Sequence, residues 1–332
     1  MSGLVRLALI GCGSNGRGHA LRSRQLAGVA MRGFADVREA AARDLADEFE
    51  GAYATTDVER VLRDDGVDAV VISTHHDSHP SLAIAAAAAG KHILVEKPLA
   101  LTVEDCQRIE EAVARAGVQL MVGFKMRFMP TVREVRRLVP RPILLVGQMM
   151  DNRWSDSSWA QDPRTGGGNV LSQGVHNFDL LCYLAGPNAE PESIYAAGGT
   201  LTHRGTEVID NVLGVMRLTN GCVAAILNGD AGLPPYTSKF FYQLFDGVRT
   251  ATLYQRCHRA RLTGVDPDEI DAAVAFPDED PEGFTQELAE FVECVRNNRP
   301  PTTGATAADG TRATRLALTA FESVRTGQVV RL

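Results

Sequence analysis

The stretch GCGSNG, from Gly11 to Gly16, has the glycine spacing of a phosphate-binding turn. It follows a predicted strand, VRLALIG, and opens a predicted helix. Backbone N–H groups at the start of a helix bind phosphate because the helix dipole is positive there. We therefore predict that a dinucleotide cofactor is held by the whole turn: Gly11, Cys12, Gly13, Ser14, Asn15 and Gly16.

Asp36 supplies the second feature of such a site. It stands about 20 residues after the last glycine, at the end of the predicted strand VAMRGFA, where a carboxylate can bond the adenosine ribose. A carboxylate there repels a 2′-phosphate, which favours NAD over NADP. Arg38 could instead accept that phosphate, so NADP stays possible.

The tripeptide Glu96-Lys97-Pro98 ends another predicted strand, HILVEK. Open α/β sheets bind their ligands at the carboxyl ends of the strands. The pattern therefore places Glu96 beside the cofactor and points Lys97 into the cofactor crevice. A surface lysine next to a loop proline is the alternative interpretation.

A polar stripe marks residues 169–184. At 100° per residue, four side chains of this predicted helix fall within an arc of about 60°: Ser172, His176, Asp179 and Tyr183. Apolar residues occupy much of the remaining helix surface. A histidine flanked by a hydroxyl and a carboxylate, and preceded by three glycines, indicates a function in proton transfer, whereas a structural core histidine is the alternative.

The elements that must position these residues change character after residue 123. Over residues 1–123, short β-rich runs alternate with helical ones, which predicts a doubly wound parallel sheet that binds a dinucleotide. Over residues 124–332, runs joined by Asn220-Gly221 and by Asp246-Gly247 predict hairpins of an antiparallel sheet with flanking helices. A last helix is expected over residues 306–326, with Gly327 as its stop, and it could pack on either domain.

The composition excludes several classes of protein. A net charge of −7 leaves no basic field for nucleic acid or anionic lipid, so neither partner is expected. No run approaches the roughly 20 apolar residues of a membrane span, and the opening apolar run is too short for a signal peptide. The six cysteines contain no Cys-x-x-Cys pair, which indicates reduced thiols and a cytoplasmic protein without a zinc site.

Four stretches resemble, in order and spacing, the glucose-fructose oxidoreductase, inositol dehydrogenase and MocA family: GCGSNG, DAVVISTHHDSH, GKHILVEKPLALT and GGGNVLSQGVHNFDLL. The resemblance covers nearly the whole chain. It implies the α/β fold class, with an N-terminal Rossmann domain and a C-terminal α+β domain that has a large, mostly antiparallel open sheet. In that family the open sheet often forms the oligomer interface, so a homo-oligomer, dimer or tetramer, is expected.

The resemblance also implies the roles of the predicted catalytic residues. Lys97 and His176 would face each other across the nicotinamide and converge on the same carbon–oxygen bond. Lys97 would hydrogen-bond the reacting oxygen, and His176 would take the hydroxyl proton as hydride leaves carbon. Asp179 would orient the imidazole or be structural.

Two positions depart from the pattern of the family. Many members have Asp where this chain has Ser172, and a serine cannot be an ionised partner or a spare base, so an inositol substrate does not follow from the resemblance. His75 replaces a frequent proline. We expect the cofactor to contact Thr74, His75 and His79, and we expect no metal at the cluster of His75, His76 and His79, because no acid or cysteine stands in ligand spacing.

The loop of residues 151–168 contains both tryptophans of the protein, whose flat faces suit a sugar or a carboxylated ring or else cover the core. Arg127 is expected near the substrate. The predicted substrate-binding residues are Lys97, Arg127, Trp154, Trp159, Ser172, Gln173, His176 and Tyr236. The spacing from Tyr236 to Lys239 is one residue short of the short-chain dehydrogenase motif, so that family is not supported.

These features predict an NAD(P)-dependent dehydrogenase or reductase. It would move hydride between the nicotinamide and a secondary alcohol or ketone of a sugar, a sugar derivative or a cyclic polyol. Three alternatives stay open: a trans-dihydrodiol dehydrogenase, a non-catalytic NAD-binding regulator of the same fold, and NAD-assisted glycoside cleavage without net NADH.

Overall fold

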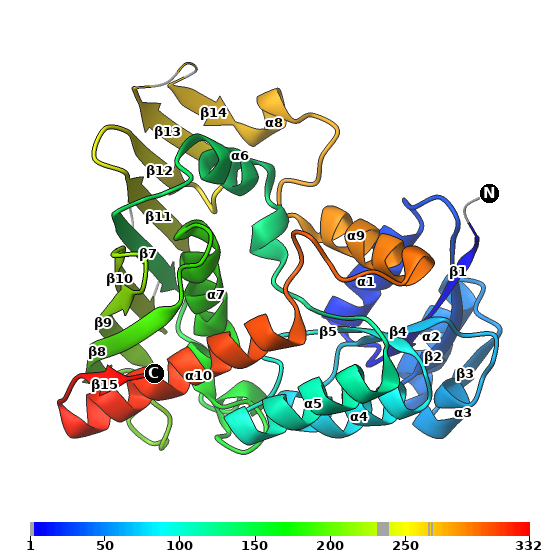
Figure 1. Cartoon of the computed structure of the whole chain (residues 1–332). Coiled ribbons are helices and arrows are strands. Elements are labelled where there is room, and N and C mark those ends of the chain that lie inside the picture. The colour runs from blue at the N-terminus through cyan, green and yellow to red at the C-terminus, as the bar shows by residue number, and fades with distance from the viewer. Residues whose placement is uncertain (1–2, 231–238, 265, 267) are drawn as a thin grey trace. The chain divides into compact units, whose positions relative to one another are not determined.

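The computed structural model describes residues 3–230, 239–264, 266 and 268–332, and its chain divides into two compact units (Figure 1). The first unit comprises Met1–Lys125 and Phe284–Thr311, and the second comprises Met126–Gly283 and Arg312–Leu332. The chain thus enters the first unit twice.

A parallel sheet forms the centre of the first unit, in the order β3-β2-β1-β4-β5-β6. Its strands are β1 (Val5–Ile10), β2 (Val29–Ala35), β3 (Tyr53–Thr55), β4 (Ala69–Ile72), β5 (His92–Val95) and β6 (Leu120–Val122). Nearly every residue of β1 and β4 is buried, as expected for central strands with both faces covered. The predicted doubly wound sheet is confirmed, although the short strand β3 was not predicted.

Helices connect these strands: α1 (Ser14–Ser23), α2 (Glu39–Glu48), α3 (Val58–Leu62), α4 (His79–Ala88), which follows the 3-10 turn η1 (His76–Ser78), and α5 (Val103–Ala116). Thr102 caps α5, because its Oγ1 accepts a hydrogen bond from the Asp105 N–H at 3.1 Å. Helices α4 and α5 pack against each other (Figure 1).

Helix α9 (Phe284–Asn297) completes the first unit from late in the sequence. It packs on α1 and β1 and buries Leu288, Phe291 and Val292. The guanidinium of Arg296 donates to the carbonyl oxygens of Ala27, at 2.6 Å, and Gly28, at 3.0 Å. The division at residue 123 assigned this segment to the second domain, whereas its buried face and its hydrogen bonds lie in the first unit.

Among the described residues, a nine-stranded sheet forms the second unit, in the order β14-β13-β12-β11-β7-β10-β9-β8-β15. Its strands are β7 (Leu144–Met150), β8 (Pro191–Gly199), β9 (Asn211–Leu218), β10 (Val223–Gly229), β11 (Phe240–Phe245), β12 (Thr250–Tyr254), β13 (Arg259–Thr263), β14 (Glu269–Asp271) and β15 (Val330–Arg331). Strands β7 and β10 pair in parallel and the other neighbours are antiparallel. Both predicted hairpins are confirmed, and Gly221 and Gly247 adopt positive φ in their turns.

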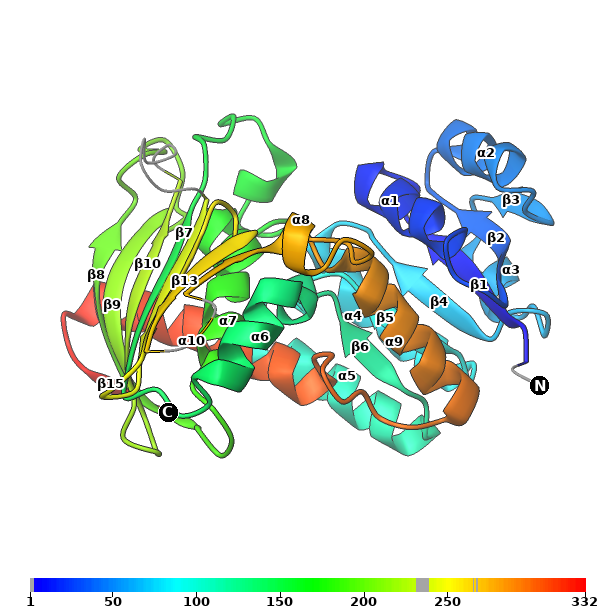
Figure 2. The same cartoon turned by 90° about the horizontal axis from the view of Figure 1, so that it is seen from above.

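Helices α6 (Pro130–Leu138) and α7 (Val175–Leu184) lie on one face of this sheet, as Figure 2 shows. On β9 every second residue is exposed, including Leu213 and Val215. Helix α10 (Ala307–Thr326) has its first five residues in the first unit and the remainder in the second, and it ends before Gly327, whose φ is +67°. The second unit also contains η3 (Trp159–Gln161), η4 (Val170–Gly174) and α8 (Ala272–Ala275), and η2 (Lys125–Phe128) begins at the unit boundary.

The single α-helix expected over residues 169–184 is wrong in its first turn. Residues Val170–Gly174 form a π-helical turn, and the α-helix begins at Val175. A π turn closes hydrogen bonds from residue i to i+5 rather than i+4, so it holds an extra residue. The assumed 100° per residue therefore applies to His176, Asp179 and Tyr183, but not to Ser172.

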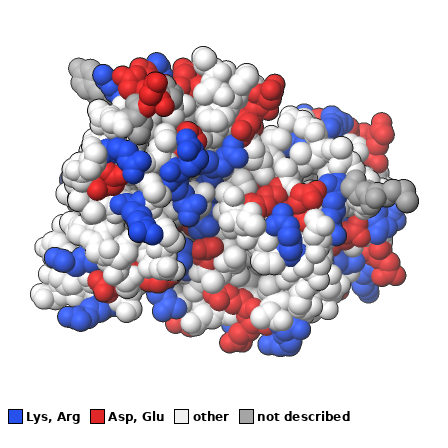
Figure 3. All heavy atoms as spheres, turned by 45° about the horizontal axis from the view of Figure 1, so that its top comes forward, with Lys and Arg blue, Asp and Glu red and all other residues white. Residues whose placement is uncertain are grey.

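Charged side chains of both signs are interspersed on the face shown in Figure 3. No helix in the described part of the chain is long and apolar enough to span a bilayer.

Candidate active site

The turn between β1 and α1 brings backbone segments unusually close together. Gly11 has φ +96°, and a Cβ there would lie 2.2 Å from the carbonyl oxygen of Ser73. A Cβ at Gly16 would lie 2.0 Å from the carbonyl oxygen of Gly11, whereas a Cβ at Gly13 would have no atom within 4 Å. Two glycines thus permit the tight packing, and the third leaves the start of α1 open, which suits a pyrophosphate bound by backbone N–H groups.

Asp36 lies at the end of β2 and contacts the glycine turn. Its Oδ2 accepts from the Cys12 N–H at 2.8 Å, and its Oδ1 accepts from the Arg38 N–H at 2.8 Å and from Arg38 Nε at 3.3 Å. Burial and the nearby Asp36 charge raise the pKa of the Cys12 thiol to about 12, so the thiol stays neutral. The three predicted cofactor residues are therefore neighbours, as an adenosine site requires.

The carboxyl end of β5 leads into Glu96, Lys97 and Pro98, and the Lys97-Pro98 peptide bond is cis. Lys97 is only 8% exposed. Glu96 Oε1 lies 2.9 Å from Nε2 of His19 on α1. Burial raises the pKa of Glu96, but the hydrogen bond from His19 and the charges of His19 and Lys97 outweigh it, so the pKa of Glu96 lies below its usual range and the carboxylate stays ionised beside Lys97.

His79 connects the turn after β4 to the turn after β5. Its Nδ1 lies 2.8 Å from the Pro98 carbonyl oxygen and its Nε2 lies 3.3 Å from the Thr74 carbonyl oxygen. Burial lowers the pKa of His79, so the ring is neutral and one nitrogen donates. His79 thus links the two turns at the carboxyl edge of the sheet through its buried ring. Thr74 is half-buried and His75 is exposed. Within residues 3–230, 239–264, 266 and 268–332, no three potential ligands form a metal cluster.

His176 lies in the first turn of α7 and is 5% exposed, and its ring contacts Phe240 edge-on, with centroids 6.5 Å apart. Ser172, in the π turn before it, is also buried. The next residue in the helix, Asn177, donates to the carbonyl oxygen of Gly147 at 3.1 Å and to Asn228 Oδ1 at 2.9 Å. These bonds fix the start of α7 on β7 and β10.

Asp179 and Arg127 form a buried bidentate ion pair. Arg127 Nε donates to Oδ2 at 2.9 Å, and a terminal nitrogen of the guanidinium donates to Oδ1 at 2.6 Å. The guanidinium also lies 5.2 Å from the centre of the Tyr183 ring. The structure therefore brings two predicted residues together, and it directs these two N–H groups of Arg127 to the protein's own carboxylate.

The tryptophan loop, residues 151–168, is held by carboxylates. The Trp154 N–H donates to Asp230 Oδ1 at 3.0 Å, and its indole Nε1 donates to Asp151 Oδ2 at 3.2 Å. Lys239 Nζ donates to Asp151 Oδ2 at 2.6 Å and to Gln173 Oε1 at 3.5 Å, which links the loop to the π turn. Trp159, in η3, is 40% exposed. Tyr236 lies outside the described residues.

Comparison with known proteins decides the family. Residues 5–124 match a family model described as an oxidoreductase family with an NAD-binding Rossmann fold, and residues 141–240 match the GFO/IDH/MocA C-terminal domain. The chain belongs to the GFO/IDH/MocA family. It is an NAD-dependent dehydrogenase, and the predicted fold class is confirmed.

Relatives of this GFO/IDH/MocA protein match it over nearly its full length. It is 27% identical to myo-inositol 2-dehydrogenase of Thermotoga maritima, over 99% of this chain and 98% of that protein. It is 28% identical to the NAD-dependent scyllo-inositol 2-dehydrogenase of Bacillus subtilis, over 99% and 96%. Its structure resembles that of levoglucosan dehydrogenase in complex with NADH and levoglucosan, with a TM-score of 0.88, 22% identity and coverage of 98% and 99%.

Two groups of functional interest were missed from the sequence. His19 stands three residues after Gly16 on the buried side of α1, and only the fold reveals its contact with Glu96. His203 and Asp230, which contact each other at 2.6 Å, belong to no motif. In each case the sequence shows a single polar residue in an otherwise apolar or turn-forming segment. Such a residue does not identify its partner.

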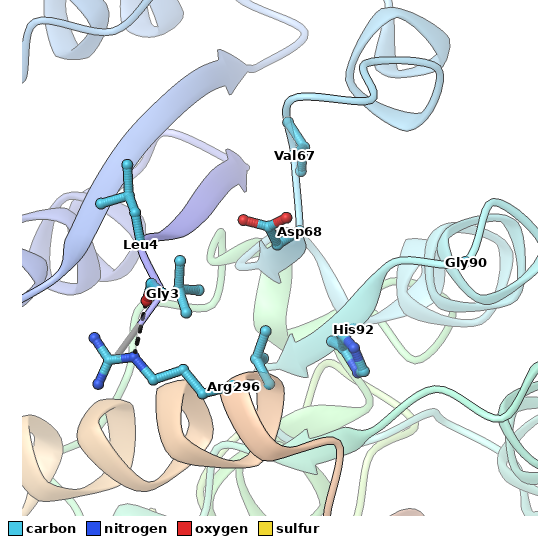
Figure 4. Close-up of a pocket in the computed structure, with 9 residues that line it drawn as sticks. Gly3, Leu4, Val67, Asp68, Gly90, His92 and Arg296 are labelled. Atoms are coloured by element: carbon cyan, nitrogen blue, oxygen red, sulfur yellow. Dashed lines mark hydrogen bonds between the residues drawn. The ribbon is translucent and has the colours of Figure 1, made fainter. Parts of the chain in front are cut away.

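A pocket of about 380 Å³ opens at the opposite edge of the parallel sheet in this GFO/IDH/MocA protein (Figure 4). It is lined at the amino ends of the strands by Leu4, Asp68 and His92, and by Arg296, whose Nε donates to the Gly3 carbonyl oxygen at 3.3 Å. Dinucleotides bind at the carboxyl ends. This pocket is therefore separate from the glycine turn, where the NAD site is expected.

Proposed function

We propose that this NAD-dependent dehydrogenase oxidises a secondary alcohol of a cyclic polyol or sugar derivative, or reduces the corresponding ketone. The full-length similarity to inositol 2-dehydrogenases supports this substrate class. The observation that carries the proposal is that the two residues which the reaction needs, Lys97 and His176, are only 8% and 5% exposed. Electrostatic stabilisation of a developing charge by such groups is stronger where water is excluded.

The glycine turn and Asp36 would hold NAD, which supplies the hydride acceptor when bound. Lys97 donates a hydrogen bond to the oxygen of the reacting carbon and stabilises the negative charge that develops there. His176 accepts the hydroxyl proton as the carbon–oxygen double bond forms. In the reverse direction His176 returns that proton, and Lys97 polarises the carbonyl.

Supporting contacts position both groups. The ionised Glu96, fixed by His19, provides a negative charge beside the Lys97 ammonium. Asn177 fixes the turn of α7 that carries His176. Asp179 acts through its ion pair with Arg127, which holds α7 against the segment that precedes α6. Trp154 and Trp159 would pack on the ring of the substrate.

The test is formation of reduced nicotinamide by the purified protein with NAD and myo-inositol, scyllo-inositol or levoglucosan. At least one of them should be oxidised. Lys97→Ala and His176→Ala should each lower kcat by at least about 100-fold, the scale of lost acid–base catalysis, while NAD binding persists. Lys91→Ala is a matched control, because Lys91 is also buried but donates to the Asp64 and Val67 carbonyl oxygens at the amino end of β5.

Near wild-type turnover by either variant would remove that residue from the mechanism. Oxidation of an aromatic trans-dihydrodiol, with none of the three polyols and sugars turned over, would select that alternative substrate class. Release of sugar from a glycoside without net formation of NADH would instead indicate NAD-assisted glycoside cleavage.

A further inference from the structure

His203 lies outside every predicted motif, yet it is fully buried and contacts two carboxylates. It belongs to the segment between β8 and β9, and none of its side chain is exposed. Its Nδ1 lies 2.5 Å from Asp156 Oδ1, and its Nε2 lies 2.6 Å from Asp230 Oδ2. Asp156 is in the tryptophan loop, whereas Asp230 directly follows β10. The ring thus joins the loop to the end of the sheet.

The two carboxylates at the ends of this bridge, which runs from Asp156 through the His203 ring to Asp230, are held in different ways. Asp230 is fully buried and also accepts from the Trp154 N–H, at 3.0 Å, and from Gln161 Nε2, at 3.0 Å. Asp156 is 62% exposed, and its other partner is the solvent-exposed Arg153. Breaking the contact to Asp156 therefore releases only the outer part of the loop around Asp156, because Trp154 keeps its hydrogen bonds to Asp230 and Asp151.

We propose that His203 is a positioning residue which fixes the tryptophan loop on the sheet of the second unit, and that this bridge sets the affinity for substrate. The proposal rests on the proposed function only for the loop's role in substrate binding. The bridge itself is a property of the second unit.

A neutral imidazole has one N–H, so hydrogen bonds to both carboxylates need a second proton in the cluster, held on the ring or on Asp230, whose pKa is raised by burial. Burial lowers the pKa of His203, but the hydrogen bonds to Asp156 and Asp230 and their charges outweigh it, so the pKa lies above its usual value. Among the described residues, three other charged groups lie in this cluster. Asp210 accepts from the backbone N–H of His203, and Arg153 donates to Asp156. The third is the ion pair between Lys239 and Asp151. Since the folded-state pKa is raised, the stabilisation is full below about pH 6.5 and is lost as the pH rises through the folded-state pKa.

The chain contains its own reporter of this loop, since its two tryptophans are Trp154 and Trp159. Tryptophan emission and its quenching by acrylamide should be followed in the whole protein from about pH 5.5 to about pH 9.5. In the wild type, quenching should increase and the emission should shift to the red as the pH rises, with a midpoint above 6.5. In His203→Gln and in Asp156→Ala the loop should be exposed throughout, and the transition should disappear.

Two controls isolate the bridge. His258→Gln removes another histidine bonded to a carboxylate, Glu282 at 3.0 Å, in the turn between β12 and β13. Arg153→Gln removes only the exposed partner of Asp156. Both should retain the wild-type transition. A transition that persists unchanged in Asp156→Ala would overturn the proposal, and this exposed site keeps the test valid even if His203→Gln does not fold.

Kinetics then tests the second half of the proposal. With whichever of myo-inositol, scyllo-inositol or levoglucosan is oxidised, Asp156→Ala should raise KM about tenfold with little change in kcat or in the KM for NAD. If fluorescence shows that the loop is released in Asp156→Ala but the KM for substrate is unchanged, the bridge holds the loop and does not set the affinity for substrate. If none of the compounds is oxidised, the fluorescence result still decides whether the bridge exists, so the two proposals fail separately.

Discussion

The Asp36 carboxylate combines a structural and an electrostatic effect that two substitutions can separate. Asp36→Asn keeps an acceptor for the Cys12 N–H but removes the charge that would repel a 2′-phosphate. Asp36→Ala removes both. We expect each variant to lower the preference for NAD over NADP by about tenfold, and Asp36→Ala also to weaken NAD binding.

The measurement is titration of both dinucleotides by fluorescence or calorimetry. Asp57→Asn is the matched control, because Asp57 caps α3 with an exposed carboxylate and Asn caps a helix equally well. A preference that does not change in Asp36→Asn would mean that the carboxylate does not face the ribose.

Sequence motifs located single residues but not their partners. The glycine turn with Asp36 was identifiable because its members have a fixed spacing along the chain. Arg127 and Asp179 are 52 residues apart, and His19 and Glu96 are 77 apart. No local pattern encodes such a contact, since it depends on how the elements pack. The role of Arg127 near the substrate was inferred without its buried carboxylate partner in view.

At the scale of elements, the β1–α1 turn separates two uses of glycine. Gly13→Ala places its Cβ in open space on the side expected to face the pyrophosphate, so we predict a normally stable protein that loses NAD affinity. Gly16→Ala places its Cβ 2.0 Å from a carbonyl oxygen inside the turn, so the turn must move and the protein should be destabilised by about 1–3 kcal/mol.

Thermal unfolding without NAD and equilibrium binding of NAD check this prediction. Gly90→Ala is the control for mutation of a solvent-facing glycine. A Cβ at Gly90 would also meet no atom, but Gly90 lies at the amino edge of the sheet, away from the glycine turn. Its φ of +71° makes the substitution locally strained without affecting that turn. If Gly13→Ala bound NAD like the wild type, the phosphates would not pass over Gly13.

Elements with strong periodicity were predictable and elements with weak periodicity were not. The paired runs around Asn220-Gly221 and Asp246-Gly247 alternate over enough residues to identify both hairpins. Strand β3 has three residues, too few for any period to emerge. The π turn before α7 was missed because a fixed period of 3.6 cannot register an inserted residue.

At the scale of the whole molecule, the first unit is built from two separate parts of the chain. Helix α9 was not predicted from the sequence, and although its buried residues recur at helical spacing, such a stripe does not say which sheet the helix covers. Arg296 supplies the missing link, because its guanidinium donates to the carbonyl oxygens of Ala27 and Gly28, directly before β2. Such a contact spans 269 residues of sequence, so a boundary drawn from a change in local pattern could not include it.

This discontinuous unit leads to a prediction about how NAD stabilises the protein. NAD at about 100 times its Kd stabilises the state that binds it by about 2.7 kcal/mol, and it should slow hydrogen exchange of the amides that open only when the first unit unfolds by up to about 100-fold. Because α9 packs on α1 and β1, its amides should gain protection together with those of β1 and β4, although α9 comes much later in the sequence than either strand. Exchange should be measured by mass spectrometry with and without NAD, with the β12–β13 hairpin of the second unit as the internal comparison. Protection of β1 and β4 without protection of α9 would contradict the assignment of α9 to the unit that binds the cofactor.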